Sequence, residues 1–223
     1  MPKDLVIIGN GSFAKLLHYY LTEYSEYNVK AFSVNSEYLL KMNNSSGGGV
    51  SLVPFEELET YYPPNEVEVI LGIGYSQMND VRKKMFFACK EKGYNIASFI
   101  HLTAVVSKDI VLGEGNIILE NTIIQPFVEI GAGNLFWHNV KIAHDDKIGS
   151  FNTFAQNTSV AGVVNIGNNC FFGNSSIILN RKNIADYTLV GAGAICKADT
   201  NPYDVIVPAK GVVLENRKSI DYI

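Results

Sequence analysis

One short segment carries a histidine beside a carboxylate, the pairing that general base catalysis requires. His144 and Asp145 stand in VKIAHDDKIG, residues 140–149. A neighbouring carboxylate can hold the imidazole in one tautomer and raise its basicity. Such a base removes the proton from a hydroxyl or an amine as that group attacks an electrophile. A His-Asp dipeptide alone is weak evidence, so the elements around it must decide whether it does chemistry.

A second segment has the composition of a phosphate-binding turn. GNGSFAK, residues 9–15, follows a short apolar run and opens a helical pattern, with Ser12 as the expected N-cap. Free N–H groups and the helix dipole at such a turn bind phosphate. Ala14 stands where the GxGxxG motif has its last glycine, so the motif is a weak signal by itself.

The composition limits the classes of function. The chain of 223 residues has a formal net charge of -4, which argues against a general nucleic-acid binder. Its three cysteines are far apart, which predicts a reduced, cytoplasmic protein without disulfides or structural zinc. The apolar runs are short, so we expect neither a signal peptide nor a membrane span.

Residues 1–99 alternate strand and helix patterns, which predicts an α/β domain with a small, parallel, Rossmann-like sheet. The expected strands are DLVIIG (4–9), YNVKAFSV (27–34), VEVILGIG (67–74) and YNIASFI (94–100). The expected helices are SFAKLLHYYLTEY (12–24) and QMNDVRKKMFFACKEKG (77–93). NNSSGGG, residues 43–49, is typical of a loop.

The rest of the chain repeats with a period of six. From Ile100 to Cys196 every sixth residue is apolar, at 17 positions in all, and the next residue is often glycine or alanine. The period predicts a solenoid of short strands, in which the apolar residue points inward and the small residue turns the corner. Three such sides close a coil of about 18 residues, and coils stack at about 4.8 Å. We expect the solenoid over residues 100–200 and a closing segment with a tail over 201–223.

The hexad repeat resembles that of the left-handed parallel β-helix acyltransferases. With its α/β domain, the chain resembles the sugar O- and N-acyltransferases of the sialic-acid O-acetyltransferase type, including the UDP-4-amino-sugar N-acetyltransferases of bacillosamine synthesis. The resemblance implies direct transfer from acetyl-CoA to a UDP- or dTDP-linked amino-deoxy sugar in a ternary complex, within surface glycan biosynthesis. It also implies a homotrimer with active sites between subunits, and the left hand of the helix.

The resemblance assigns roles to residues that match the motifs of the family. His144 would be the base and Asp145 its orienting acid, in the setting H-[DE]-x-x-I-G. Gly162, one coil later, would either serve a turn or offer its N–H to the thioester carbonyl. Gly191 in GAGAICK and Lys210 in VPAKG would contact the coenzyme.

The resemblance also implies that the glycine-rich turn holds a nucleotide sugar rather than NAD; the other interpretation is a domain that only caps the first coil. The residues expected near the diphosphate are Gly9, Gly11, Ser12 and Lys15, and those near the base are Asn35 and Gly74. Trp137 would either stack on a sugar face or pack at the trimer interface.

Departures from the family leave the acceptor open. Ala143, Trp137 and Thr153 stand where the bacillosamine relative has a glutamate, an asparagine and a second histidine. An amine is the first choice of acceptor, and a sugar hydroxyl, as in sialic-acid O-acetylation, is the alternative. We expect no metal.

Two other classes of protein remain as further alternatives. A zinc hydratase of the γ-carbonic anhydrase kind would use His101, His138 and His144 at a subunit interface, although His101 occupies a different place in its hexad. His18 lies in the first helical pattern, where a surface or packing role is expected. A scaffold that kept the fold and lost the chemistry is the other alternative.

Overall fold

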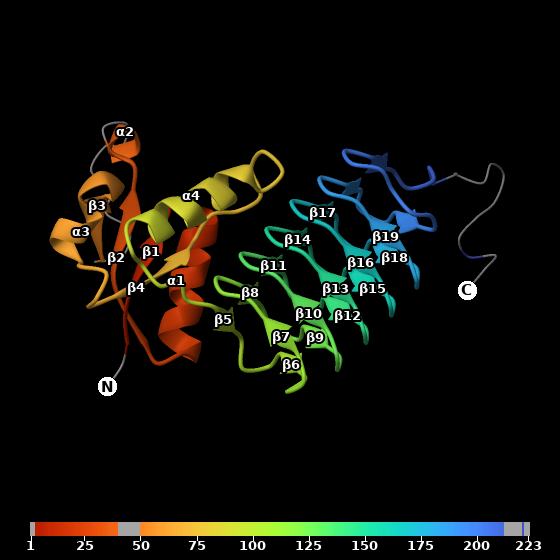
Figure 1. The fold of residues 1–223 in the computed structure, drawn as a ribbon, viewed down its shortest axis with the longest axis horizontal. Helices are drawn as coiled ribbons and strands as arrows, with labels where there is room; N and C mark the ends of the chain where they lie inside the picture. Colours follow the sequence, from red (N-terminus) through yellow and green to blue (C-terminus); the bar gives the residue numbers. More distant parts are fainter. Residues whose placement is uncertain (1–2, 40–49, 212–219, 221–223) are drawn as a thin grey trace.

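The computed structural model describes residues 3–39, 50–211 and 220, and it shows an α/β part followed by a β-helix (Figure 1). The coils of the β-helix extend away from the α/β part, as Figure 1 shows. The loop expected at 43–49, and most of the tail expected after residue 211, lie outside the described residues. No helix within the described residues has the length and apolar character that a membrane crossing requires.

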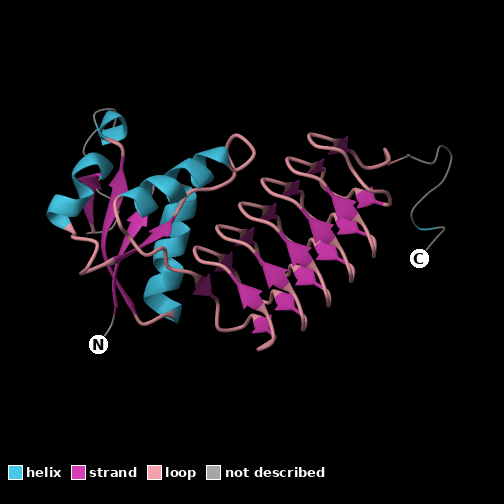
Figure 2. Ribbon diagram, in the orientation of Figure 1, coloured by secondary structure: helices cyan, strands magenta, loops and turns pink. Residues whose placement is uncertain are grey.

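The α/β part is a four-stranded parallel sheet with helices on both faces (Figure 2). Its strands lie in the order β3-β2-β1-β4. They are β1 (Lys3–Ile8), β2 (Tyr27–Val34), β3 (Ser51–Pro54) and β4 (Glu68–Leu71). The helices are α1 (Ser12–Tyr24), α2 (Ser36–Leu39), η1 (Phe55–Glu57), α3 (Leu58–Tyr61) and α4 (Asp80–Glu91). Alternate residues of β1 face opposite sides, so that Leu5 and Ile7 pack with α1 while Val6 and Ile8 pack in the cluster that contains Phe86 of α4.

Two expectations for this part are wrong, and one strand was not predicted. Residues 94–98 form no strand, because only the single bridge between Val69 and Ile96 joins them to the sheet before the chain turns into the first coil. The fourth strand is instead β3, whose four residues end in a proline and carry little periodic signal. Ser12 is the first helical residue rather than the N-cap, which is Gly11 in an extended conformation.

The β-helix has three flat faces, each a parallel sheet of two-residue strands. Face 1 contains β5 (Phe99–Ile100), β8 (Ile117–Ile118), β11 (Leu135–Phe136), β14 (Thr153–Phe154), β17 (Phe171–Phe172), β20 (Leu189–Val190) and β22 (Val205–Ile206). Face 2 contains β6 (Val105–Val106), β9 (Ile123–Ile124), β12 (Lys141–Ile142), β15 (Ser159–Val160), β18 (Ile177–Ile178) and β21 (Ile195–Cys196). Face 3 contains β7 (Val111–Leu112), β10 (Glu129–Ile130), β13 (Lys147–Ile148), β16 (Asn165–Ile166) and β19 (Asn183–Ile184).

The predicted fold class, a parallel α/β sheet followed by a left-handed parallel β-helix, is confirmed. From β5 to β21, strand residues of one coil pair with those 18 positions later, as Phe136 does with Phe154; β20 and β22 pair at a spacing of 16. The rings of Phe136, Phe154 and Phe172 stack at 4.7 Å between centroids, with interplanar angles of 3° and 6°. This spacing equals the distance between neighbouring strands of a sheet, so the strands alone set the pitch of the coils.

The inward positions agree with the hexad pattern except at its start. The apolar residues from Ile118 to Cys196 in this series are buried. Ile100 is instead 42% exposed, and Val106 and Leu112 are only partly buried, because these residues belong to the first coil and lack a coil beneath them.

The corners are turned by a different residue than expected. Every sixth residue from Gly115 to Gly193 has a φ between 56° and 70°, and it stands three places after the inward residue. The small residues that directly follow the inward positions serve close stacking instead. A Cβ on Gly113, for example, would lie 2.8 Å from the carbonyl carbon and oxygen of Gly131.

A ladder of asparagines supports the corner between faces 3 and 1. The Oδ1 atoms of Asn116, Asn134 and Asn152 accept the backbone N–H of the residue 18 positions later, at 2.9, 2.8 and 2.7 Å. The Nδ2 atom of Asn134 donates to the carbonyls of Gly131 at 3.2 Å and Gly149 at 3.0 Å. Each amide therefore satisfies one backbone donor and carbonyl acceptors in the interior of the coil.

Arg82 of α4 joins the two parts of the chain. Its side chain is buried and donates to the carbonyls of Gly74 at 2.6 Å, Gly133 at 2.9 Å and Asn152 at 3.0 Å. Its Nη2 also donates to Oγ1 of Thr153 at 3.0 Å. Thr153 is thus buried at the junction of the two parts.

We expect Arg82→Met to lower the free energy of unfolding by about 3 kcal/mol, since it leaves buried carbonyls without donors. Urea unfolding followed by circular dichroism measures the loss. Lys84→Met is the matched control, because Lys84 is an exposed cation on the same helix, and it should change the stability by less than about 0.5 kcal/mol. Equal effects of the two substitutions would contradict the role given to Arg82.

Candidate active site

His144 and Asp145 form a close pair on the corner between faces 2 and 3. Nδ1 of His144 lies 2.7 Å from Oδ2 of Asp145, and the two side chains are 58% and 53% exposed. Asp145 is the corner residue of its hexad, with a φ of 59°. The backbone N–H of His144 donates to Oε1 of Gln125 at 3.1 Å, which fixes the start of the corner. The structure therefore presents an accessible imidazole whose Nδ1 is engaged by a carboxylate, as a general base requires.

Gly162 lies directly against the imidazole, as the register of 18 residues predicts. A Cβ on Gly162 would stand 3.0 Å from both Cε1 and Nε2 of His144. The backbone N–H of Val163 donates to the carbonyl of His144 at 3.1 Å, which ties the two coils together at this point. The absence of a side chain at Gly162 thus leaves room for the ring edge that carries Nε2.

Asp146 completes the corner and was missed by sequence reasoning. It is fully buried, and its Oδ1 accepts the N–H of Val164 at 2.8 Å. Burial raises the pKa of this carboxyl to about 7, against the opposing effects of the Val164 N–H, of His144 and of the Ala143 backbone. A signal was available, because Val128 and Val164 occupy the same column of the neighbouring coils and a carboxylate there breaks an apolar series.

The other histidines do not join this site. His101 is 5% exposed and packs against the rings of Tyr20 and Tyr24, at 5.5 and 4.6 Å between centroids. His138 follows β11, on the corner between faces 1 and 2, and His18 packs against Phe32 within the α/β part. Within the residues described, no three histidine, cysteine or acidic side chains come together as metal ligands would.

The residues expected to hold the nucleotide gather at one edge of the N-terminal sheet. Gly9 follows β1, Asn35 follows β2 and Gly74 lies three residues after β4, so all three stand at the carboxyl ends of parallel strands. Ligands of open α/β sheets bind at such an edge. Gly9 has a φ of 107°, and a Cβ there would lie 2.9 Å from the carbonyl oxygen of Gly72, so only glycine fits.

The side of this edge formed by α1 is open. A Cβ on Gly11 or on Gly74 would have no atom within 4 Å. Ser12 and Lys15, on the first turn of α1, are exposed. The helix N-terminus is therefore accessible to an anion, and the contacts predicted for these residues remain predictions.

Trp137 links the glycine-rich turn to the β-helix. Its ring packs against Phe13 of α1 at 5.4 Å between centroids, with an interplanar angle of 50°. Its backbone carbonyl accepts a hydrogen bond from Oγ1 of Thr122 at 2.9 Å. Trp137 is partly exposed and stands on the corner between faces 1 and 2, so its contact with a sugar remains a prediction.

The two residues expected to meet the coenzyme near the end of the helix lie apart from His144 within one chain. Gly191 follows β20, on the corner between faces 1 and 2, and its N–H donates to the carbonyl of Ile206 at 2.7 Å. Lys210 is exposed near the end of the described residues. The structure thus places Gly162, and not Gly191, beside the candidate base.

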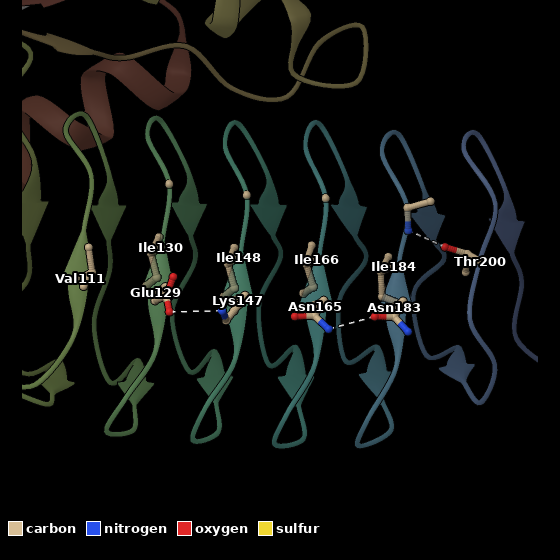
Figure 3. A pocket seen from close by; sticks show the side chains of 14 residues that line it. Val111, Glu129, Ile130, Lys147, Ile148, Asn165, Ile166, Asn183, Ile184 and Thr200 are labelled. Carbon is tan, nitrogen blue, oxygen red and sulfur yellow. Dashed lines mark hydrogen bonds and ion pairs between the residues drawn. The ribbon is translucent and has the colours of Figure 1, made fainter.

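A groove of about 600 Å³ runs along face 3, which begins at the corner that carries His144 (Figure 3). Gly131, Gly149 and Gly167 line it in successive coils. Glu129 and Lys147 form an ion pair at 3.5 Å beside it, and Nδ2 of Asn165 donates to Oδ1 of Asn183 at 2.9 Å. The groove was not predicted, although the column of glycines at 18-residue spacing indicates a surface with no side chains.

Among known proteins, solved structures match this chain. No family model and no curated protein matches the chain. A variant of GDP-perosamine N-acetyl transferase from Caulobacter crescentus, in complex with CoA and GDP-perosamine, aligns with a TM-score of 0.81 and 22% identity, covering 92% of this chain and 93% of that chain. The acetyltransferase domain of PglB from Neisseria gonorrhoeae FA1090, in complex with acetyl coenzyme A, aligns with a TM-score of 0.79 and 18% identity over 94% of this chain and all of that chain.

The chain has the fold of these two acetyltransferases. WeeI from Acinetobacter baumannii AYE also aligns, with a TM-score of 0.66 and 17% identity, over 86% of this chain and 95% of that chain. In each case the match covers both the α/β part and the coils, so the arrangement of the two parts is shared. At these identities the likeness establishes the fold alone.

Gly162→Ala tests the close approach of the two coils at the site. The added methyl group would lie 3.0 Å from Cε1 and Nε2 of His144, so we expect the ring to rotate away and the stability to fall by about 1 kcal/mol. NMR signals of the imidazole and a crystal structure of the variant would show the displacement. Gly211→Ala, at a glycine with open space, is the control and should leave the ring unchanged. An unmoved ring in Gly162→Ala would refute the contact.

Proposed function

We propose that the protein is an acyltransferase that transfers the acetyl group of acetyl-CoA to an amino-deoxy sugar carried on a nucleotide. The observation that carries this proposal is the pair of His144 and Asp145 at 2.7 Å, exposed on a corner of a β-helix. The fold shared with two acetyltransferases, one of them bound to GDP-perosamine and CoA, supports the substrate class.

In the proposed mechanism, the residues of one corner act together. Nε2 of His144 takes a proton from the sugar amine as its nitrogen attacks the thioester carbonyl, and Asp145 stabilises the imidazolium through Nδ1–H. The N–H of Gly162 donates to the oxyanion of the tetrahedral intermediate. When the intermediate collapses, the carbon–sulfur bond breaks and the proton held by His144 leaves with the thiolate of CoA. A sugar hydroxyl would use the same base, and this O-acetyltransferase reaction is the alternative.

The binding roles follow from the two ends of the site. The diphosphate would be held by Gly9, Gly11, Ser12 and Lys15. The nucleobase would lie beside Asn35 and Gly74. Trp137 would lie near the sugar, and Gly191 and Lys210 would contact the coenzyme. Uracil, thymine and guanine are the three nucleobases that the substrate could carry. The three cysteines are free and buried, which supports a role in the cytoplasm.

The proposal includes a homotrimer with active sites between subunits. Within one chain, Trp137 and the glycine-rich turn lie toward the corner between faces 1 and 2, while His144 lies on the corner between faces 2 and 3. A neighbouring chain could supply a glycine-rich turn or a coenzyme contact closer to His144. The groove on face 3, with its column of glycines, offers a surface that a second copy could approach.

Light scattering coupled to size-exclusion chromatography tests this assembly. We expect a mass three times that of the 24.6 kDa chain. Asn165→Trp, at an exposed residue that lines the groove, adds bulk on this surface and should lower the mass, while Lys84→Gln on α4 should not. A wild-type protein that is monomeric at high concentration would contradict the shared site.

Acetyl transfer is best measured by release of CoA thiol with a panel of UDP-, dTDP- and GDP-linked 3-amino and 4-amino 6-deoxy sugars. We expect turnover with at least one of them, and His144→Ala should reduce it by roughly 10²-fold or more. His138→Ala is the matched control, because His138 stands at the same place in its hexad on another corner, and it should retain the rate of the wild type.

Each outcome of the panel has a distinct meaning. Equal rates for His144→Ala and the wild type would refute the assignment of the base. No turnover of any amine, with acetyl-CoA still bound, would favour a hydroxyl acceptor. No turnover and no binding of acetyl-CoA would favour the non-catalytic scaffold.

A further inference from the structure

One carboxyl group lies inside the coil directly behind the candidate base. Asp146 is fully buried, with Oδ1 bonded to the N–H of Val164 at 2.8 Å. Its Oδ2 atom is also buried and has no hydrogen-bond partner in the described part of the chain. Burying an ionised carboxylate oxygen without a hydrogen-bond partner costs free energy of folding, so the protonation state of Asp146 needs an explanation.

The asparagine ladder shows what an atom in the place of Oδ2 meets. Asn134 and Asp146 both stand four places after an inward residue, and both use Oδ1 to accept the N–H of the next coil. The Nδ2 of Asn134 then donates to carbonyls three residues earlier and fifteen residues later. The carbonyls at the corresponding spacing from Asp146 belong to Ala143 and Ala161. A protonated Oδ2 could donate to such carbonyls as an asparagine amide does, whereas an ionised Oδ2 has no hydrogen-bond donor within the described residues.

The bond from Val164 to Asp146 acts on the site itself. Val163 donates to the carbonyl of His144, and Val164 donates to Asp146, so two consecutive N–H groups hold this strand of backbone to the coil of His144. Gly162, immediately before them, is the residue that abuts the imidazole. Val128 and Val164 occupy the column of Asp146 in the adjacent coils and have no polar side chain, so this bond is a feature of the His144 coil.

We propose that Asp146 is a protonated positioning residue, which acts as an asparagine would and fixes the backbone of Gly162 against His144. Its effect on acetyl transfer rests on the proposed function, whereas its protonation and its effect on the position of the ring do not. The reaction needs no proton from this group, because Oδ2 is sealed inside the coil.

The charged groups around Asp146 are few. His144 and Asp145 lie on its own corner and act on it in opposite directions. The coils before and after present Val128 and Val164, and Lys182 follows in the column two coils later. Burial, the largest cause, raises the pKa of Asp146 from its ordinary value of 3.8 to about 7. The folded chain therefore holds a proton that the unfolded chain releases, so stability falls as pH rises from about 4 to about 7.

The variants Asp146→Asn and Asp146→Val separate protonation from position. Asn keeps the shape and both kinds of hydrogen bond without a titrating group. Val is the residue of the neighbouring coils, so Asp146→Val should fold, and it lacks the acceptor for Val164. Urea unfolding of the wild type and both variants between pH 4 and 8 reports the protonation of Asp146. NMR signals of the His144 imidazole report the position of the ring.

As the pH rises from 4 to 7, we expect the urea midpoint of the wild type to fall relative to that of Asp146→Asn. Only the wild type releases a buried proton from this position when it unfolds. Parallel pH dependence in the two proteins would overturn the protonated state. We expect the imidazole signals of His144 to shift in Asp146→Val and to stay in place in Asp146→Asn. Unchanged signals in Asp146→Val would overturn the positioning role.

Activity adds a third readout once the panel has found a substrate. Asp146→Val should lower kcat by about tenfold, the worth of one ordered hydrogen bond, and Asp146→Asn should restore it. A wild-type kcat in Asp146→Val would overturn the positioning role in transfer. Silence of the wild type on the whole panel would count against the proposed function, and the unfolding and NMR results would still decide the proposal for Asp146.

Discussion

The structure depends on one constraint, which is that the strands of the β-helix from β8 to β21 stack on residues 18 positions before them. Parallel strand pairing sets the distance between coils, and the left-handed backbone at every sixth residue turns each corner. Within this lattice a side chain has one neighbour below and one above, so each column of the sequence is a column in space. Glycines in one column form the floor of a groove, and asparagines in another form a ladder.

The candidate site is an interruption of that regular lattice. Four features meet on one corner: an exposed histidine, a carboxylate bonded to its Nδ1, a glycine against its ring edge and a buried acid behind it. A rigid stack suits such a site, because each group is held by backbone bonds to two other coils rather than by a flexible loop. The geometry of His144 and Gly162 therefore follows from the coils themselves.

The α/β part depends on the same stack. Its helix α1 packs on face 1, and Arg82 of α4 donates to carbonyls of two successive coils. This long cationic side chain satisfies several carbonyl groups at once at the junction, because its guanidinium has five donors. The open edge of the sheet and the corner of His144 consequently keep a fixed relation in each chain.

The sequence by itself determined the repeat, the number of sides, the inward residues from Ile118 onward and the contact between His144 and Gly162. A fixed period can be interpreted without tertiary information. The position of a residue in its hexad decides whether its side chain points inward, and a separation of 18 residues decides which residue stacks on it. Tertiary structure alone decided the rest. Arg82 looked like one more charged residue of an amphipathic helix, and β3 had too few residues to show a period. Asp146 stands in a column that is apolar in the neighbouring coils, but only the tertiary structure shows that its carboxyl is fully buried there, where loss of solvent changes its chemistry.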